Sequence, residues 1–360
     1  MTAPGSPLAT RIAARIAASG PVTLAEWMAD CLTDPEHGYY VTRDPLGRGG
    51  DFTTAPEISQ MFGEMLAMSL AQGWADQGRP PAFVLAELGP GRGTLMADVL
   101  RTLAAMPGMD AAAEVHLVEA SPTLRARQRA ALGDRPVTWH DSVETLPADR
   151  PLYLLANEFF DALPIRQFER VPGGWRERMV GHDGAGFRWG LGPLTDFPAL
   201  AHHRTAAPGT IAELCPALPG ITAAIAARIA ARGGIALILD YGGWDGTGDT
   251  LQAMRDHAFT DPFADPGAAD LTAHVDFAAL ARAARAAGVA ASGMTAQGLL
   301  LQRLGIDARA AQLAGRLTGA GLDSHVAAHR RLTHPEEMGN LFKGLALYPS
   351  SAPCPAGFDT

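Results

Sequence analysis

The chain has 360 residues, of which 47% are hydrophobic and 19% are charged, and its formal net charge is −9. This composition is typical of a soluble α/β enzyme with one large or two modest domains, and it excludes a disordered or fibrous chain. The negative charge and the lack of any Lys/Arg run argue against a nucleic-acid partner, because phosphate recognition needs clustered basic side chains.

The cysteines and the apolar runs narrow the class further. Cys31, Cys215 and Cys354 share no short metal-binding spacing and form an odd set, so we expect neither a bound metal nor a disulfide framework. No apolar stretch approaches 18 residues, which argues against a transmembrane segment. Residues 1–20 lack the apolar centre of a secretory signal, and residues 11–19 are interpreted as the first helix.

Residues 1–80 are expected to form a mainly helical N-terminal segment. Apolar residues recur at helical spacing over residues 9–33. Thr23 followed by Glu26 has the form of a capping box, which predicts that a helix begins there. A second amphipathic pattern predicts a helix over residues 57–76.

Strands that alternate with helices define the expected core, residues 81–160 and 233–348. Short apolar runs predict five strands, at residues 83–87, 115–119, 137–139, 151–156 and 235–240. Such alternation implies crossover connections and a mainly parallel sheet, so the fold class is α/β. Ligands are expected at the carboxyl ends of the strands. Further strands near residues 293–295 and 341–348 could close the sheet.

The long interval between the fourth and fifth strands, residues 161–232, is interpreted as an inserted capping subdomain. Residues 166–178 have the pattern of a β-hairpin, and residues 221–232 have the composition of an Ala-rich helix. Beyond the core, residues 349–360 are expected to form a C-terminal tail.

The segment Glu87-Leu88-Gly89-Pro90-Gly91-Arg92-Gly93 lies between a predicted strand and a predicted helix. Glycines there let the backbone approach a ligand, so Gly89, Pro90 and Gly91 are predicted cofactor contacts. A phosphate-binding P-loop would need a Lys before Thr94, and a dinucleotide loop would need the spacing G-x-G-x-x-G. The observed G-x-G-x-G spacing, preceded by an acid, is common in loops that bind S-adenosylmethionine (SAM).

NAD is the alternative cofactor for this loop. Its pyrophosphate would be repelled by Glu87, whereas the ammonium and sulfonium groups of SAM would be attracted. The sign of the charge therefore favours SAM, and Glu87 is predicted to contact it.

Acidic residues also follow the second and third predicted strands. Glu119 could accept hydrogen bonds from both ribose hydroxyls of an adenosine, and Asp141 with Ser142 could accept a hydrogen bond from the adenine amino group. Each has an ordinary alternative, since Glu119 could be a solvated strand end and Asp141-Ser142 a helix cap or turn. Together with the glycine loop, these strand-end acids favour a nucleoside site.

The fourth strand leads into Asn157-Glu158-Phe159-Phe160-Asp161-Ala162-Leu163-Pro164, at the reacting end of the predicted site. Asn157 could contact the incoming nucleophile, and Glu158 and Asp161 place two carboxylates on one short turn. Two carboxylates can grip a guanidinium bidentately, stabilise its charge and accept a proton. The alternative is a helix cap followed by a Pro-terminated turn.

His274 and Asp276 are further catalytic candidates. They could reach the same face, although Asp276 could equally cap a helix over residues 276–287 and leave His274 exposed.

The glycine-rich segment of residues 48–59 supplies further candidate contacts. Asp51 and Glu57 could reach the amino group of the cofactor, with Phe52 as an apolar lid.

These motifs together resemble the MidA-type methyltransferase family. The resemblance rests on Gly50-Asp51-Phe52, Pro56-Glu57-Ile58-Ser59, Phe62-Gly63-Glu64, the glycine segment with Thr94-Leu95, and Asn157 to Pro164. Shorter matches are Asp240-Tyr241-Gly242, Asp249-Thr250-Leu251-Gln252, Asp270-Leu271-Thr272, His274-Val275-Asp276-Phe277, Gln297-Gly298 and Phe342-Lys343.

The resemblance extends over residues 36–347 and implies a Rossmann-like, seven-strand class I methyltransferase sheet, with residues 1–80 as a lid over the cofactor. It implies SAM contacts at Gly50, Asp51, Phe52, Glu57, Ser59, Gly89, Gly91, Glu119 and Asn157. Ala55 stands where the family more often has Ser, which removes one possible hydroxyl contact.

The resemblance also implies protein-arginine ω-N-methylation that yields symmetric dimethylarginine. Eukaryotic members are mitochondrial and assist complex I assembly, so the expected partner is a protein with a target arginine, such as a complex I subunit. The alternatives are a SAM-binding assembly factor with little catalysis and a small-molecule methyltransferase. The lack of a clear transit peptide indicates a bacterial, cytoplasmic member rather than one of the mitochondrial matrix. The oligomeric state stays open.

Overall fold

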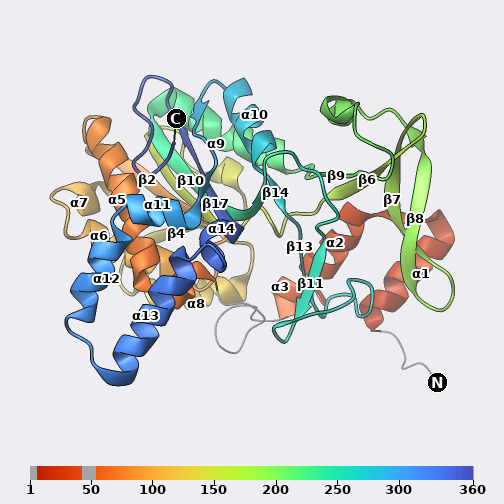
Figure 1. Cartoon of the computed structure of the whole chain (residues 1–360), viewed down its shortest axis with the longest axis horizontal. Helices are drawn as coiled ribbons and strands as arrows, with labels where there is room; N and C mark the ends of the chain where they lie inside the picture. Colours follow the sequence, from red (N-terminus) through yellow and green to blue (C-terminus); the bar gives the residue numbers. More distant parts are fainter. Residues whose placement is uncertain (1–5, 43–53, 360) are drawn as a thin grey trace. The chain divides into compact units, whose positions relative to one another are not determined.

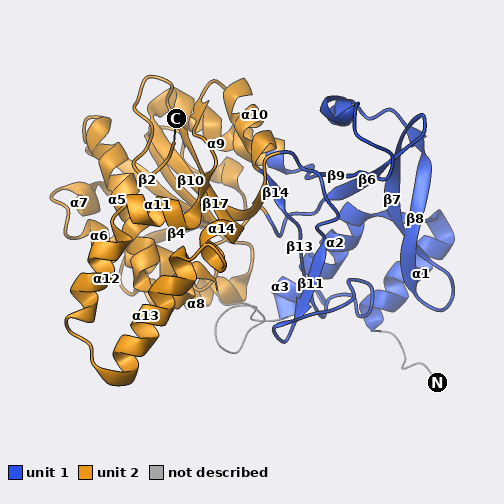
Figure 2. Ribbon diagram, viewed as in Figure 1, with its two compact units in different colours: residues 1–52, 161–218, 245–276 blue, residues 53–160, 219–244, 277–360 orange. Residues whose placement is uncertain are grey.

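The structure is a computed structural model that describes residues 6–42 and 54–359 (Figure 1). It contains two compact units, each assembled from separate stretches of the chain (Figure 2). Unit 1 consists of Met1–Phe52, Asp161–Leu218 and Asp245–Asp276, and unit 2 consists of Thr53–Phe160, Pro219–Trp244 and Phe277–Thr360. Each unit has its own strand pairings and its own hydrophobic core.

Unit 2 is built on a mainly parallel sheet. In spatial order its strands are β15 (Ala290–Ala291), β17 (Phe342–Tyr348), β10 (Gly234–Gly243), β5 (Leu152–Asn157), β2 (Phe83–Leu88), β3 (Ala113–Val118) and β4 (Val137–His140). The last five are parallel, whereas β17 runs antiparallel to β10, to β15 and to β16 (Thr295–Ala296). This arrangement confirms the predicted α/β class with a Rossmann-like seven-strand sheet.

Helices of unit 2 connect and cover these strands. They are α4 (Ala55–Ile58), α5 (Gln60–Asp76), α6 (Thr94–Leu103), α7 (Met109–Ala112), α8 (Pro122–Leu132), η1 (Val143–Thr145), α9 (Leu218–Arg232), α10 (Phe277–Ala286), α11 (Gln297–Arg303), α12 (Ile306–Ala314), α13 (Gly319–Thr333) and α14 (Met338–Leu341). β2 and β5 are buried along their whole length, as expected for strands covered on both faces. Phe62 and Leu66 of α5 belong to the same core cluster as Leu85 of β2. Among the described helices, none is long and apolar enough to span a membrane.

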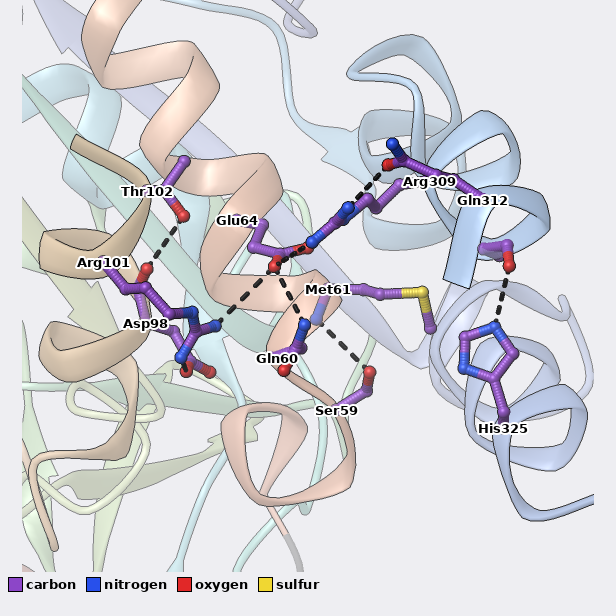
Figure 3. A network of polar contacts seen from close by, with 11 residues as sticks. Ser59, Gln60, Met61, Glu64, Asp98, Arg101, Thr102, Arg309, Gln312 and His325 are labelled. Carbon is purple, nitrogen blue, oxygen red and sulfur yellow. Dashed lines mark hydrogen bonds and ion pairs between the residues drawn. The ribbon is translucent and has the colours of Figure 1, made fainter. Parts of the chain in front are cut away.

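A network of charged side chains joins α5, α6 and α12 (Figure 3). Glu64 of α5 is buried, and its carboxylate accepts hydrogen bonds from Arg309 Nε at 2.7 Å and from a terminal nitrogen of Arg309 at 2.8 Å. Gln60 Nε2 donates to the same carboxylate at 3.0 Å, and a guanidinium nitrogen of Arg101 lies 3.6 Å from it. The bidentate pair satisfies a buried charge and attaches α12 to α5.

Unit 1 combines N-terminal helices with small antiparallel sheets. Its helices are α1 (Pro7–Ser19), α2 (Leu24–Thr33), α3 (Tyr39–Thr42) and η2 (Pro198–His203). One sheet has the order β1 (Val22–Thr23), β7 (Gly174–His182), β6 (Arg166–Val171) and β9 (Ile211–Leu214), with β8 (Phe187–Thr195) also paired to β7. Another has the order β12 (Ala258–Phe259), β11 (Gln252–Arg255) and β13 (Asp270–Thr272). The two-residue strand β14 (Val275–Asp276) follows β13 in the chain and is not a member of this sheet.

Two local predictions in unit 1 are confirmed. The predicted hairpin is formed by β6 and β7, which pair antiparallel. The predicted capping box is present, because Thr23 Oγ1 accepts from the Glu26 backbone nitrogen at 3.2 Å and Glu26 Oε2 accepts from the Thr23 backbone nitrogen at 2.8 Å.

The boundaries between the two units differ from the domain boundaries expected from the sequence. The predicted helix over residues 57–76 corresponds to α4 and α5, which belong to unit 2 rather than to the N-terminal segment of residues 1–80, because α5 packs into the core of unit 2. Residues 245–276, expected in the core, belong to unit 1. There the Glu213 carboxylate accepts from the Thr250 backbone nitrogen at 2.9 Å.

The expected insertion and tail are also divided differently. Of residues 161–232, those from Pro219 onward belong to unit 2 with most of α9. The expected tail of residues 349–360 is attached to unit 2, where Phe358 is buried and the Asp359 carbonyl accepts from the Gly293 backbone nitrogen at 2.8 Å. These assignments depend on contacts between distant residues, which local sequence patterns do not reveal.

Arg309→Met is expected to lower the free energy of unfolding by about 1–3 kcal/mol, because it leaves the buried Glu64 carboxylate without its bidentate partner. Urea denaturation measures this change. Arg330→Met is the matched control, since Arg330 pairs with Glu337 at the surface and an exposed pair contributes at most about 1 kcal/mol. Equal losses of stability in the two variants would contradict the role given to the Glu64 network.

Candidate active site

The glycine segment forms the turn between β2 and α6. The φ angles of Gly89, Gly91 and Gly93 are +59°, +52° and +86°, in the left-handed region that favours glycine. A Cβ on Gly89 would lie 3.0 Å from Phe159 Cδ2, and one on Gly93 would lie 3.2 Å from Gln128 Cα. Conformation and space therefore both restrict this turn to glycine.

Glu87 lies near the end of β2, directly before this turn, and is only 3% exposed. Its Oε2 accepts no hydrogen bond from the described residues. Burial raises the pKa of Glu87 to about 8, although a hydrogen bond from the Met96 backbone acts in the opposite direction. A buried carboxyl with an oxygen still able to accept fits a ligand group that carries N–H donors and positive charge.

Glu119 follows β3 and is held by hydrogen bonds on both carboxylate oxygens. The Ser121 backbone nitrogen donates to Oε1 at 2.8 Å, and Gln128 Nε2 donates to Oε2 at 3.1 Å. The same Gln128 nitrogen donates to the Gly91 carbonyl at 2.8 Å. Burial raises the pKa of Glu119. The structure thus brings Glu119 next to the glycine turn, as a shared nucleoside site requires.

Two residues of this region were not assigned from the sequence. Gln128 shares the buried face of α8 with Leu124. A polar residue in the apolar stripe of a predicted helix is the feature of the sequence that could have identified Gln128. Asp240 of β10 is fully buried, and its carboxylate accepts from the backbone nitrogens of Phe160 at 3.0 Å and Tyr241 at 2.9 Å. Asp240 therefore fixes the turn that follows β5.

Asp141 and Ser142 lie after β4 and adopt the turn that was the alternative interpretation. The Asp141 side chain is 87% exposed and pairs with Arg125 at 2.5 Å. Ser142 precedes η1, and its carbonyl accepts from the Thr145 hydroxyl at 2.8 Å. An adenine contact from either residue stays a prediction.

Glu57 and Ser59 lie on and after α4, and Glu57 reaches the glycine turn. Thr94, the first residue of α6, donates its hydroxyl to Glu57 Oε1 at 2.5 Å. Ser59 Oγ accepts from the Met61 backbone nitrogen at 3.2 Å and so caps α5. The other predicted contacts of this segment, Gly50, Asp51 and Phe52, lie outside the described residues.

Asn157 is the last residue of β5, and Glu158 is the first residue of the turn that follows. Asn157 Nδ2 donates to Glu158 Oε1 at 3.1 Å, and Asn157 Oδ1 accepts no hydrogen bond from the described residues. Glu158 has a φ of +50°, and its backbone nitrogen is held by the Leu239 carbonyl at 2.9 Å. A non-glycine residue in the left-handed region costs free energy, and such strain is concentrated at functional sites.

Asp161, His274 and Asp276 belong to unit 1, and the chain passes from unit 2 to unit 1 between Phe160 and Asp161. Asp161 is buried, and its carbonyl accepts from the Ala273 backbone nitrogen at 2.9 Å. The backbone nitrogen of the next residue, His274, donates to the Thr250 hydroxyl at 2.9 Å. The structure therefore brings Asp161 beside the segment that carries His274, whereas their catalytic roles stay predictions.

Unit 2 has the features of an α/β enzyme that binds a nucleoside. The glycine turn, Glu119 and the Asn157-Glu158 turn follow the adjacent parallel strands β2, β3 and β5, and their carboxyl ends lie at one edge of the sheet. Two buried acceptors there, Glu87 Oε2 and Asn157 Oδ1, receive no hydrogen bond from the described residues. These features fit a nucleoside that carries an ammonium group and hydroxyls, which is the chemistry of SAM.

Comparison with known proteins agrees with this class. The sequence matches a family of S-adenosyl-L-methionine-dependent methyltransferases over residues 65–295. "Protein arginine methyltransferase NDUFAF7, mitochondrial" from Mus musculus is 38% identical, covering 96% of this chain and 85% of the mouse protein. The Homo sapiens protein of the same name is 37% identical, covering 96% of this chain and 84% of its own length. A crystal structure of a Burkholderia thailandensis protein bound to S-adenosyl-homocysteine has a TM-score of 0.82 and 30% identity, covering 100% of this chain and 96% of that one.

The chain therefore belongs to this family of SAM-dependent methyltransferases. It is a methyltransferase with SAM as its cofactor, which confirms the resemblance, the enzyme class and the cofactor predicted from the motifs.

Gly91→Val is expected to abolish SAM binding, because a β-branched side chain strains the left-handed backbone of Gly91 and would enter the space where we predict the cofactor. Isothermal titration calorimetry with SAM measures the loss. Gly288→Val is the matched control, since Gly288 has a φ of +88° but no neighbouring atom within 4 Å of a Cβ. Retained SAM affinity in Gly91→Val would contradict the placement of the loop.

Glu87 is expected to make the free energy of unfolding fall as pH rises. Its pKa is about 8 in the folded chain and 4.5 as the ordinary value, so the folded state binds the extra proton between these limits. The stabilising contribution is complete below about pH 4.5 and is lost as pH rises through about 8, with a slope of up to about 1.4 kcal/mol per pH unit. Glu87→Gln should remove this slope in denaturation curves measured across that window, and an unchanged slope would contradict the buried, neutral carboxyl.

Proposed function

We propose that the chain is a protein-arginine ω-N-methyltransferase that yields symmetric dimethylarginine, with a respiratory complex I subunit as acceptor. The observation that carries the proposal is the Asn157-Glu158 turn, where a glutamate with a strained backbone follows the central strand β5 of a SAM-dependent methyltransferase. The relatives named protein arginine methyltransferase support the same chemistry, since this chain covers 83–85% of their length.

The cofactor would be held along the edge formed by β5, β2 and β3. The buried Glu87 Oε2 suits an N–H donor of its ammonium group, Glu119 suits the ribose hydroxyls, and Glu57 acts through Thr94 on the glycine turn. When bound, SAM supplies an electrophilic methyl group on a positively charged sulfur. The proposed contacts are Gly50, Asp51, Phe52, Glu57, Ser59, Glu87, Gly89, Pro90, Gly91, Glu119, Asp141, Ser142 and Asn157.

The acceptor guanidinium would be bound by the carboxylate of Glu158, whereas the role predicted for Asp161 stays a prediction from the sequence. A planar guanidinium matches carboxylates in a bidentate geometry, which orients one nitrogen toward the methyl group. Glu158 would hold one guanidinium nitrogen toward the methyl group that SAM would supply, and would accept the N–H proton that this nitrogen loses. Its negative charge would also stabilise the cationic product. Asn157 would orient the nucleophile, and the catalytic roles of His274 and Asp276 stay predictions from the sequence.

The partner and the compartment follow from the same proposal. The relatives are named as mitochondrial proteins, so the matrix is the proposed location in a eukaryotic cell and the cytoplasm in a bacterial one. A SAM-binding assembly factor with little catalysis and a small-molecule methyltransferase are the competing functions, and the following experiment distinguishes them.

Glu158→Gln is expected to retain SAM affinity but to slow methyl transfer by about 10²–10⁴-fold, because it removes a charged partner and proton acceptor. The measurement has two parts: calorimetry with SAM, and intact masses of complex I subunits from cells that lack the gene and express either wild type or the variant. One subunit should gain the mass of two methyl groups with wild type and not with Glu158→Gln.

Glu336→Gln is the matched control, because Glu336 is an exposed glutamate on unit 2. It should restore the same subunit mass as wild type. An unchanged subunit mass with wild type would eliminate arginine methylation of complex I. Equal transfer by Glu158→Gln would remove Glu158 from the mechanism.

A further inference from the structure

Gln128 is a fully buried polar residue that connects three parts of unit 2. Its Nε2 donates to the Gly91 carbonyl at 2.8 Å and to Glu119 Oε2 at 3.1 Å. Its Oε1 accepts from Trp139 Nε1 at 2.8 Å. One side chain of α8 therefore contacts the glycine turn, the acid after β3 and an indole of β4.

The chemistry of these partners determines the orientation of the amide. The Trp139 indole nitrogen is only a donor, so the oxygen of Gln128 must face it. The amide nitrogen then faces a carbonyl and a carboxylate, which are both acceptors, and its two hydrogens are both used. A reversed amide would place its oxygen against two acceptors and its hydrogens against a donor. This orientation is therefore the only one that satisfies all three contacts.

The surroundings hold Gln128 in place. Its Cα lies 3.2 Å from the position that a Cβ would take on Gly93, so α8 packs directly against the glycine turn. The indole of Trp139 is covered on one face by the Arg129 guanidinium, 4.4 Å from the ring centroid. Packing therefore fixes both the backbone of α8 and the Trp139 indole, whose N–H donates to the Gln128 amide oxygen.

We propose that Gln128 is a positioning residue that holds the Glu119 carboxylate and the Gly91 carbonyl in one geometry, so that the site selects nucleosides with intact ribose hydroxyls. The proposal rests on the cofactor placement given above. Ser121 and Gln128 each hold one oxygen of Glu119, and the remaining lone pairs of the carboxylate keep a fixed direction for the two hydroxyls. Without Gln128, the carboxylate and the turn could move independently.

The test compares two ligands, S-adenosyl-homocysteine and its analogue that lacks both ribose hydroxyls, by calorimetry. Wild type should bind the complete ligand at least about tenfold more tightly than the analogue. Gln128→Met should bind the complete ligand about tenfold or more weakly, with little change for the analogue, so that the preference is lost. Trp139→Phe, which keeps Gln128 but removes the donor that orients its amide, should lose part of the preference.

Gln77→Met is the matched control, because Gln77 bridges both backbone groups of Gly234 at the opposite edge of the sheet. It should keep the wild-type preference. An unchanged preference in Gln128→Met and Trp139→Phe, or an equal loss for both ligands, would overturn the positioning role. No binding of S-adenosyl-homocysteine to wild type would instead overturn the cofactor placement.

Discussion

The parallel pairing of β10, β5, β2, β3 and β4 is the constraint on which the site depends. Parallel strands end at a common edge, so side chains that follow different strands meet although they are far apart in the chain. Glu87, Glu119 and Asn157 lie at or just after the carboxyl ends of β2, β3 and β5. Asp240 lies within β10, next to Leu239, which pairs with Asn157 at the end of β5. The pairing of β2, β3 and β5 therefore brings polar groups from separate parts of the chain to one edge of the sheet.

Buried acids of unit 2 are stabilised in different ways, and the difference separates structural from functional roles. Glu64 is paired with Arg309, and the Asp240 carboxylate is satisfied by backbone nitrogens. Glu119 is held by Ser121 and Gln128 and keeps lone pairs for further donors. Glu87 has an oxygen that accepts nothing from the described residues, so it can accept a hydrogen bond from an N–H donor of a ligand. Burial raises its pKa, and a cation bound beside it would favour the charged form again.

The local structure was predicted best where one short segment contains the whole signal. The glycine turn, the capping box at Thr23 and the hairpin of β6 and β7 depend on residues only a few positions apart, and all three are present. Gln128 shows the limit of such reasoning. Its helical spacing indicates a buried face, but its contacts with Gly91, Glu119 and Trp139 span three segments and arise only when β2, β3 and β4 pair.

The sequence by itself determined the α/β class, the glycine turn and SAM as the cofactor of the chain, because hydrophobic alternation, glycine spacing and the order of the motifs can be read along the chain. The tertiary structure alone decided where the units divide. It assigned α5 to unit 2 and residues 245–276 to unit 1, and it directed Asp141 toward Arg125 and solvent. The physical reason is that the burial and the ion pairs of a side chain depend on the residues that packing brings near it. No local sequence pattern specifies those residues.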